Sequence, residues 1–209
     1  MTPEQFLHRC KVICHVGPVG VWEQITKHGF RTAEQLILEA DLTEEERQAL
    51  LSTPRRESVR LSVRGDAVTL RDQGPLFARK DLKSILGDGL DASDWIHLLN
   101  QRVYFFTDET SMRKLLDKYL QIDGGQDVIW LSPLKLIEAA GLRLELTSQN
   151  TATIARQSGT QKMADAFAPL WRFTDRKPTE ATILGGLDDL SPVFRAERCF
   201  QDGRRQILT

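Results

Sequence analysis

The sequence has little that would place the chain in a membrane or in a secretory route. No apolar run approaches the roughly 20 residues that a membrane-spanning helix needs. The first residues, Met1 to Gln5, show no basic region followed by an apolar core, so a signal peptide is not expected. We therefore expect a cytoplasmic protein that makes no contact with membranes.

Cysteine is also scarce, with only Cys10, Cys14 and Cys199 in the chain. An odd number of cysteines without paired spacing argues against a disulfide framework. Cys10 and Cys14 are four residues apart, but no second pair of cysteines or histidines completes a zinc site. The sequence therefore predicts no bound metal, and the thiols are expected to be buried and inert.

The sequence also has no large excess of charge of one sign, because 28 basic and 29 acidic residues leave a formal net charge of -1. This balance argues against a protein that binds nucleic acid through its overall charge, although a local basic patch stays possible. The short clusters Arg55-Arg56 and Arg204-Arg205 could serve nucleic acid, but such pairs are more often solvated surface.

The composition suits one folded domain. The 209 residues are 41% hydrophobic and 27% charged, which is enough for a sizeable core, and we see no repeat or low-complexity tract. Helical patterns dominate the first half, whereas strands with short helices dominate the second, which favours an α+β fold. We expect a single domain over residues 1–209 with a mainly helical insert at about 31–101, in which Ser58–Val63 and Ala67–Leu70 form a hairpin.

Three segments contain the residues most suited to a binding site. The first runs from Cys14 to Phe30, where a strand ends near His15 and a glycine turn leads into an amphipathic helix closed by Gly29. A histidine at the exit of a core strand can contact a ligand, or it can be satisfied by the backbone. Without further partners the residue types do not decide between these two roles.

The second segment, Arg102–Thr107, reads as an aromatic strand. Its aromatic side chains could form a wall for a planar ring, and Arg102 could meet a phosphate. The third segment, Leu144–Thr151, holds Ser148-Gln149-Asn150 between two predicted strands, Leu142–Thr147 and Thr151–Ala155. Each segment also fits a purely structural role, as a core strand or a hairpin turn.

Taken in order, these segments resemble the ADP-ribosyltransferase fold superfamily, and within it the RNA 2'-phosphotransferases and the DarT-like DNA ADP-ribosyltransferase toxins. The resemblance covers residues 12–30 and 102–156 and lies in the order of elements more than in any single motif. It implies an ADP-ribosyltransferase-like split β-sheet core with NAD bound in the cleft between two small sheets. It also implies transfer of ADP-ribose to a nucleic-acid or protein acceptor, with release of nicotinamide.

The resemblance assigns roles to residues of this chain. His15 would hydrogen-bond a ribose of NAD, with Val16 and Gly17 beside it, and Tyr104 or Phe105 would stack on the nicotinamide ring. The remaining positions that it assigns to the nucleotide or to catalysis are Arg102, Ser148 and Asn150.

One position departs from the family pattern. Asn150 lies in the turn where transferases of this fold place a catalytic glutamate, and no carboxylate is present there. Glu145 and Glu197 are the replacements that the sequence offers. If neither serves, the chain would be a non-catalytic nucleotide-binding or interaction module.

The phosphotransferase branch offers a third alternative. An RNA 2'-phosphotransferase-like enzyme would need several arginines to converge on one phosphate. The available arginines are Arg102, Arg143 and Arg156, none of which matches a signature.

Overall fold

The computed structural model describes residues 1–73, 91–148, 151, 166–175 and 177–209. Its α-helices are α1 (Pro3–Arg9), α2 (Val21–His28), α3 (Ala33–Glu39), α4 (Glu44–Ser52), α6 (Ala92–Asn100), α7 (Glu109–Asp123) and α8 (Pro133–Ala140). Two 3-10 turns, η2 (Gly141–Arg143) and η5 (Leu170–Arg172), complete the helical elements of this part of the chain.

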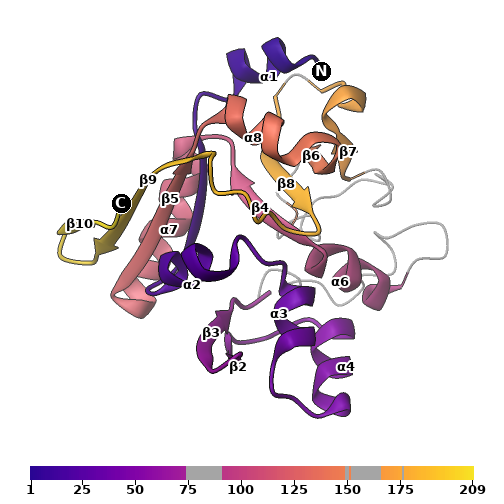
Figure 1. Ribbon diagram of the computed structural model, residues 1–209, viewed down its shortest axis with the longest axis vertical. Coiled ribbons are helices and arrows are strands. Elements are labelled where there is room, and N and C mark those ends of the chain that lie inside the picture. Colours follow the sequence, from indigo (N-terminus) through magenta and orange to yellow (C-terminus); the bar gives the residue numbers. More distant parts are fainter. Residues whose placement is uncertain (74–90, 149–150, 152–165, 176) are drawn as a thin grey trace.

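Eight strands form one antiparallel sheet in the order β10-β9-β5-β1-β4-β8-β6-β7 (Figure 1). They are β1 (Ile13–Pro18), β4 (Arg102–Phe106), β5 (Gly125–Leu131), β6 (Leu144–Thr147), β7 (Ala168–Pro169), β8 (Glu180–Leu184), β9 (Val193–Phe200) and β10 (Arg205–Ile207). The expectation of an α+β fold is confirmed, because helices and an antiparallel sheet form separate layers.

Helices cover both faces of the sheet. On one face α1, α2 and α8 bury Phe6, Ile25 and Leu136 against the apolar residues of the central strands. On the other face α7 places Met112 and Leu116 over β1, β5 and β9. The alternation of side chains along each strand supplies an apolar surface to both layers.

The region at 31–101 has its own small core. The hairpin strands β2 (Val59–Val63) and β3 (Asp66–Leu70) pack on α3 and α4 through a cluster that includes Ile37, Leu61 and Val68. In Figure 1 the hairpin and α4 lie below α2 and α6. The predicted hairpin is confirmed, and its turn uses Arg64 and Gly65 at φ 51° and 84°, as a two-residue turn of this kind requires.

The sequence interpretation was wrong about the partner of β6. β6 pairs with β8 on one side and with β7 on the other, neither of which is the predicted neighbouring strand Thr151–Ala155. Thr151 lies in a turn, and 152–155 lie outside the described residues. The strand β8, which pairs along all of β6, comes from a stretch in which we had predicted no strand.

Backbone pairing within the sheet is shortest between β1 and β4. These two strands pair only at Cys14 and Phe106, whereas β1 pairs with β5 along its whole length. The seam divides the sheet into β10-β9-β5-β1 and β4-β8-β6-β7, which remain joined in one sheet. His15 lies directly beyond the one paired position, at the point where the two strands separate.

A buried carboxylate fixes the helix that follows β1. Asp127 has no solvent exposure, and its Oδ2 accepts hydrogen bonds from the backbone N–H groups of Gly20 (2.9 Å) and Trp22 (3.3 Å). Its Oδ1 accepts from Nε of Arg198 at 2.7 Å. The carboxylate thus caps the positive end of α2 and holds the turn at Val19 and Gly20. The glycine turn predicted directly after His15 is wrong, because β1 continues through Gly17 to Pro18.

We expect Asp127→Asn to lower the free energy of unfolding by about 2–4 kcal/mol, because it removes the buried charge that caps α2 and leaves the partly buried Arg198 with Glu23 as its remaining charge partner. Urea unfolding measures this loss. The control is Asp202→Asn, which removes an exposed partner of Arg204 and should leave stability unchanged. Equal effects of the two variants would contradict the anchoring role of Asp127.

Candidate functional site

The imidazole of His15 connects β1 to β4 next to the one position where the backbones of these strands pair. Its Nδ1 lies 2.9 Å from the carbonyl oxygen of Tyr104 on β4. Because a carbonyl only accepts, Nδ1 carries the proton, and Nε2 of the neutral ring is left as an acceptor. Burial lowers the pKa of His15, so the ring is neutral at pH 7.

Two phenylalanines hold the His15 ring in place. The ring centroids of Phe30 and Phe105 lie 5.7 Å and 5.8 Å from that of His15, and 5.4 Å from each other. Phe105 is 1% exposed and belongs to the core of the sheet. Of the two aromatic residues expected to stack on a ligand, only Tyr104 is therefore partly open to solvent.

A small pocket of about 70 Å³ lies next to His15, between α2 and the hairpin region. Apolar side chains such as Val21 and Val103 form much of its lining. Gln24 and Arg31 also line it, and within the described residues the Oε1 of Gln24 and Nε of Arg31 are buried without a hydrogen-bond partner. A buried acceptor and a buried donor left unpaired favour a polar ligand at this place.

Tyr104 extends from the same seam on the next strand. Its hydroxyl donates to the carbonyl oxygen of Leu99 at 3.1 Å, and its ring contacts Phe167 edge-on with centroids 6.4 Å apart. Burial, and then the nearby Glu180 carboxylate, raise the pKa of Tyr104 well above its ordinary value. The phenol is therefore a permanent hydrogen-bond donor and an apolar ring surface at neutral pH.

Glu180, which the sequence analysis did not single out, supplies a carboxylate beside Tyr104. It begins β8 and pairs with Phe106, two residues from Tyr104 on β4, so both side chains project from the same face of the sheet. Its Oε2 accepts from the backbone N–H (3.1 Å) and the hydroxyl (2.8 Å) of Thr151. The side chain is buried, with 7% exposure.

Burial raises the pKa of Glu180 to about 7, against an ordinary value of 4.5. The two hydrogen bonds from Thr151 oppose this rise but do not cancel it. Within the described part of the chain Glu180 forms no ion pair, so a carboxylate is kept in the sheet at a cost in stability. Such groups occur mostly where chemistry requires them.

The other proposed carboxylates have different surroundings. Glu145 forms a buried ion pair with Arg102, with Oε2 of Glu145 2.7 Å from Nε of Arg102, so neither group is available to a ligand in this arrangement. Glu197 lies on β9, four strands away from β8, which corresponds to about 19 Å across the sheet. Glu145 shares the face of Tyr104, because both residues pair with Thr182, but its charge is matched by Arg102, whereas Glu197 lies far from Tyr104.

The remaining residues expected in the site differ in where they lie and in what they contact. Gly17 packs against α2, where an added Cβ would lie 2.6 Å from Cγ1 of Val21. Val16 follows His15 on β1, and the carbonyl oxygen of Ser148 accepts from the hydroxyl of Thr179 at 2.8 Å. Asn150 lies outside the described residues.

No group of three or more metal-binding side chains occurs among the described residues. In the same part of the chain, no helix is long and apolar enough to cross a membrane. The candidate residues near the seam are thus one imidazole, one phenol and one carboxylate, which come from β1, β4 and β8. The phenol and the carboxylate share one face of the sheet, whereas the His15 ring packs against Phe105, whose side chain projects from the other face.

Comparison with known proteins gives a family and no function. Residues 11–186 match the family model described as "Family of unknown function (DUF7002)". No curated protein and no solved structure matches the chain. The matched range contains all three side chains of the site, so the site lies within the part that defines the family.

Proposed function

The chain belongs to the DUF7002 family, and we propose that it is an ADP-ribosyltransferase that uses NAD as its substrate. The observation that carries the proposal is Glu180, a buried carboxylate on the strand beside Tyr104. The resemblance of the sequence to ADP-ribosyltransferases calls for a glutamate near the nicotinamide ribose. Glu180 supplies that group from β8, in place of the turn at Asn150.

In the proposed reaction the bond between the ribose C1' and the nicotinamide nitrogen breaks. The electron pair goes to the nicotinamide, which leaves as a neutral molecule, and the ribose develops oxocarbenium-like positive charge. An acceptor nucleophile then attacks C1' and gives up its proton. A carboxylate held in a buried position stabilises such a charge strongly, because little water competes for it.

The two other side chains take binding roles in this proposal. The neutral His15 ring presents Nε2 as an acceptor for a ribose hydroxyl, since Nδ1 is already engaged with Tyr104. The ring of Tyr104, on the same face of the sheet as Glu180, is proposed to contact the planar nicotinamide. The acceptor of ADP-ribose, a nucleic acid or a protein, is left open by these residues.

The alternatives receive less support. A non-catalytic nucleotide-binding module was favoured by the lack of a carboxylate, and Glu180 removes that reason. An RNA 2'-phosphotransferase needs converging arginines. Arg102 is paired with Glu145, Arg143 bonds the carbonyl oxygen of Gly186 at 2.6 Å, and Arg156 lies outside the described residues.

The direct test is to incubate the purified chain with NAD and to follow nicotinamide release together with binding by calorimetry. We expect release whose rate rises about tenfold per pH unit below pH 7 and levels off above it, because only ionised Glu180 stabilises the developing charge. Binding without release at pH 8 would point to the nucleotide-binding module. Absence of binding at millimolar NAD would overturn the proposal.

A further inference from the structure

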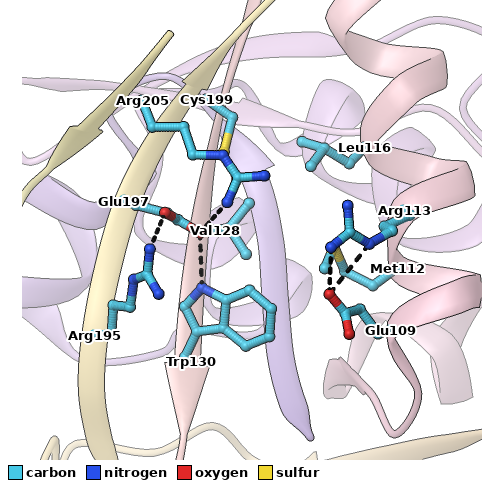
Figure 2. Close-up of a pocket in the computed structure, with 10 residues that line it drawn as sticks. All are labelled: Glu109, Met112, Arg113, Leu116, Val128, Trp130, Arg195, Glu197, Cys199 and Arg205. Carbon is cyan, nitrogen blue, oxygen red and sulfur yellow. Dashed lines mark hydrogen bonds and ion pairs between the residues drawn. The ribbon is translucent and has the colours of Figure 1, made fainter. Parts of the chain in front are cut away.

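A second pocket lies between α7 and the strands β5, β9 and β10, away from the seam. Figure 2 shows it with Trp130 from β5 at one wall, and Met112 and Leu116 from α7 opposite. Its volume is about 140 Å³, and a dry protein cavity of about 150 Å³ is large enough for benzene. The pocket therefore has room for one aromatic ring.

A buried carboxylate organises the charged side of this pocket. Glu197 is 1% exposed, and its Oε1 accepts from the indole N–H of Trp130 at 3.1 Å. Its Oε2 accepts from Nη2 of Arg195 at 2.6 Å, and Nη1 of Arg205 lies 3.6 Å from its Oε1 (Figure 2). The carboxylate thus fixes the indole and two guanidinium groups around one opening.

The guanidinium groups of Arg195 and Arg205 have more N–H donors than their contacts with Glu197 use, so donors remain for a ligand. Each carries five N–H donors, and the side chains of Arg195 and Arg205 are 44% and 52% exposed. Arg113 on α7 lines the opposite side, paired with Glu109. Three arginines against two carboxylates leave the pocket with a net charge of +1, next to apolar walls that strengthen electrostatic attraction.

We propose that this pocket binds a small aromatic anion of the aromatic carboxylate class, with its ring beside Trp130 and its carboxylate on Arg195 and Arg205. Planar guanidinium groups match the two oxygens of a carboxylate, and the indole supplies a flat surface for the ring. The site lies on β9 and β10, so it does not depend on the function proposed for His15, Tyr104 and Glu180.

The probe is benzoate, and the signal is the indole N–H of Trp130 in a ¹H–¹⁵N NMR spectrum. The chain contains 4 tryptophans, and Trp130→Phe identifies the resonance. We expect benzoate to shift the Trp130 resonance in a saturable way and to leave the other indole resonances in place. Benzyl alcohol, which has the ring but no charge, should give no saturable shift.

Single substitutions of arginine by alanine test where the carboxylate of benzoate binds. We expect Arg205→Ala, and separately Arg195→Ala, to weaken benzoate binding about tenfold, as loss of a charge-assisted hydrogen bond does. The matched control is Arg204→Ala, which removes a neighbouring arginine paired with Asp202 and should change affinity by less than about twofold. Unchanged positions of the other indole resonances show that each variant is folded.

Three results would overturn the proposal. One is the lack of a saturable shift with benzoate, which would mean that the space is a packing gap filled with water. Another is inorganic phosphate binding as tightly as benzoate, because the ring would then contribute nothing. The third is an equal loss of affinity in Arg204→Ala and Arg205→Ala.

Discussion

Glu180→Gln is expected to abolish nicotinamide release and, at pH 8, to make the folded protein more stable. Removal of one well-placed electrostatic group from a transition state costs about two to three orders of magnitude in rate. The amide keeps the shape of the side chain and an oxygen that accepts from Thr151. The loss of rate would therefore follow from the loss of charge.

The gain in stability follows from the raised pKa of Glu180, which is about 7 in the folded protein against an ordinary value of 4.5. The stabilisation from the protonated group is complete below pH 4.5 and is lost as the pH rises to 7. Above pH 7 the buried carboxylate costs up to about 3 kcal/mol, which the amide does not. Urea unfolding at pH 5 and pH 8 measures the difference between the two proteins.

Glu145→Gln is the matched control, because Glu145 lies on the neighbouring strand β6 and is similarly buried. It pairs with Arg102, so its replacement leaves a buried guanidinium without its charge partner and should lower stability by about 3 kcal/mol. A gain in stability at pH 8 for Glu180→Gln and a loss for Glu145→Gln would distinguish a functional carboxylate, which costs stability, from a structural one. If Glu180→Gln lowers stability at pH 8 and releases nicotinamide at the normal rate, Glu180 has only a structural role.

Elements set by local signals could be predicted from the sequence. Helices α3 and α4 begin at Thr32 and Thr43, whose side chains form capping boxes with Gln35 and Glu46. The hairpin β2–β3 follows from alternating apolar residues and from Gly65 in its turn. These features depend on residues a few positions apart, which the sequence places side by side.

The carboxylate of the site depends on a contact that the sequence does not reveal. β8 begins 33 residues after the end of β6, and their pairing joins segments that have no local connection. The alternation of buried Ala181 and Ile183 is a strand signal that could have been found. The register that sets Glu180 beside Phe106 is a tertiary property.

The predicted turn and the observed carboxylate are nevertheless related. The sequence analysis looked for a glutamate at the turn 148–151, and Thr151 from that turn donates two hydrogen bonds to Glu180. The turn contributes the donors, and the strand contributes the charge. Thr151, which follows the position expected to carry the catalytic group, instead holds the carboxylate proposed to act.

His15 offers the second prediction, because its two nitrogens have separate tasks. If His15 only contacted the ribose, His15→Ala would abolish NAD binding with little loss of stability. The ring, however, packs between Phe30 and Phe105 and bonds Tyr104 across the seam. Its removal would leave a cavity in the aromatic cluster and lower the free energy of unfolding by about 2–4 kcal/mol. A loss of NAD binding in the alanine variant would therefore not distinguish a lost contact from a destabilised fold.

His15→Asn and His15→Gln separate the two tasks. The asparagine amide takes the place of Nδ1 and keeps a donor for Tyr104, but it has no group where Nε2 lies. The glutamine amide reaches the position of Nε2 but leaves the carbonyl oxygen of Tyr104 without its donor. We expect His15→Asn to fold nearly normally and to lower the rate constant kcat/KM for nicotinamide release about a hundredfold.

The glutamine variant should show the reverse pattern, with lower thermal stability and a kcat/KM within about tenfold of the parent protein. Thermal unfolding and nicotinamide release, measured on both variants, give the comparison. If the asparagine variant releases nicotinamide at the parent rate, Nε2 does not contact the substrate. His15 would then serve only to join β1 to β4, and the substrate would have to be held by Tyr104 and the residues around Glu180.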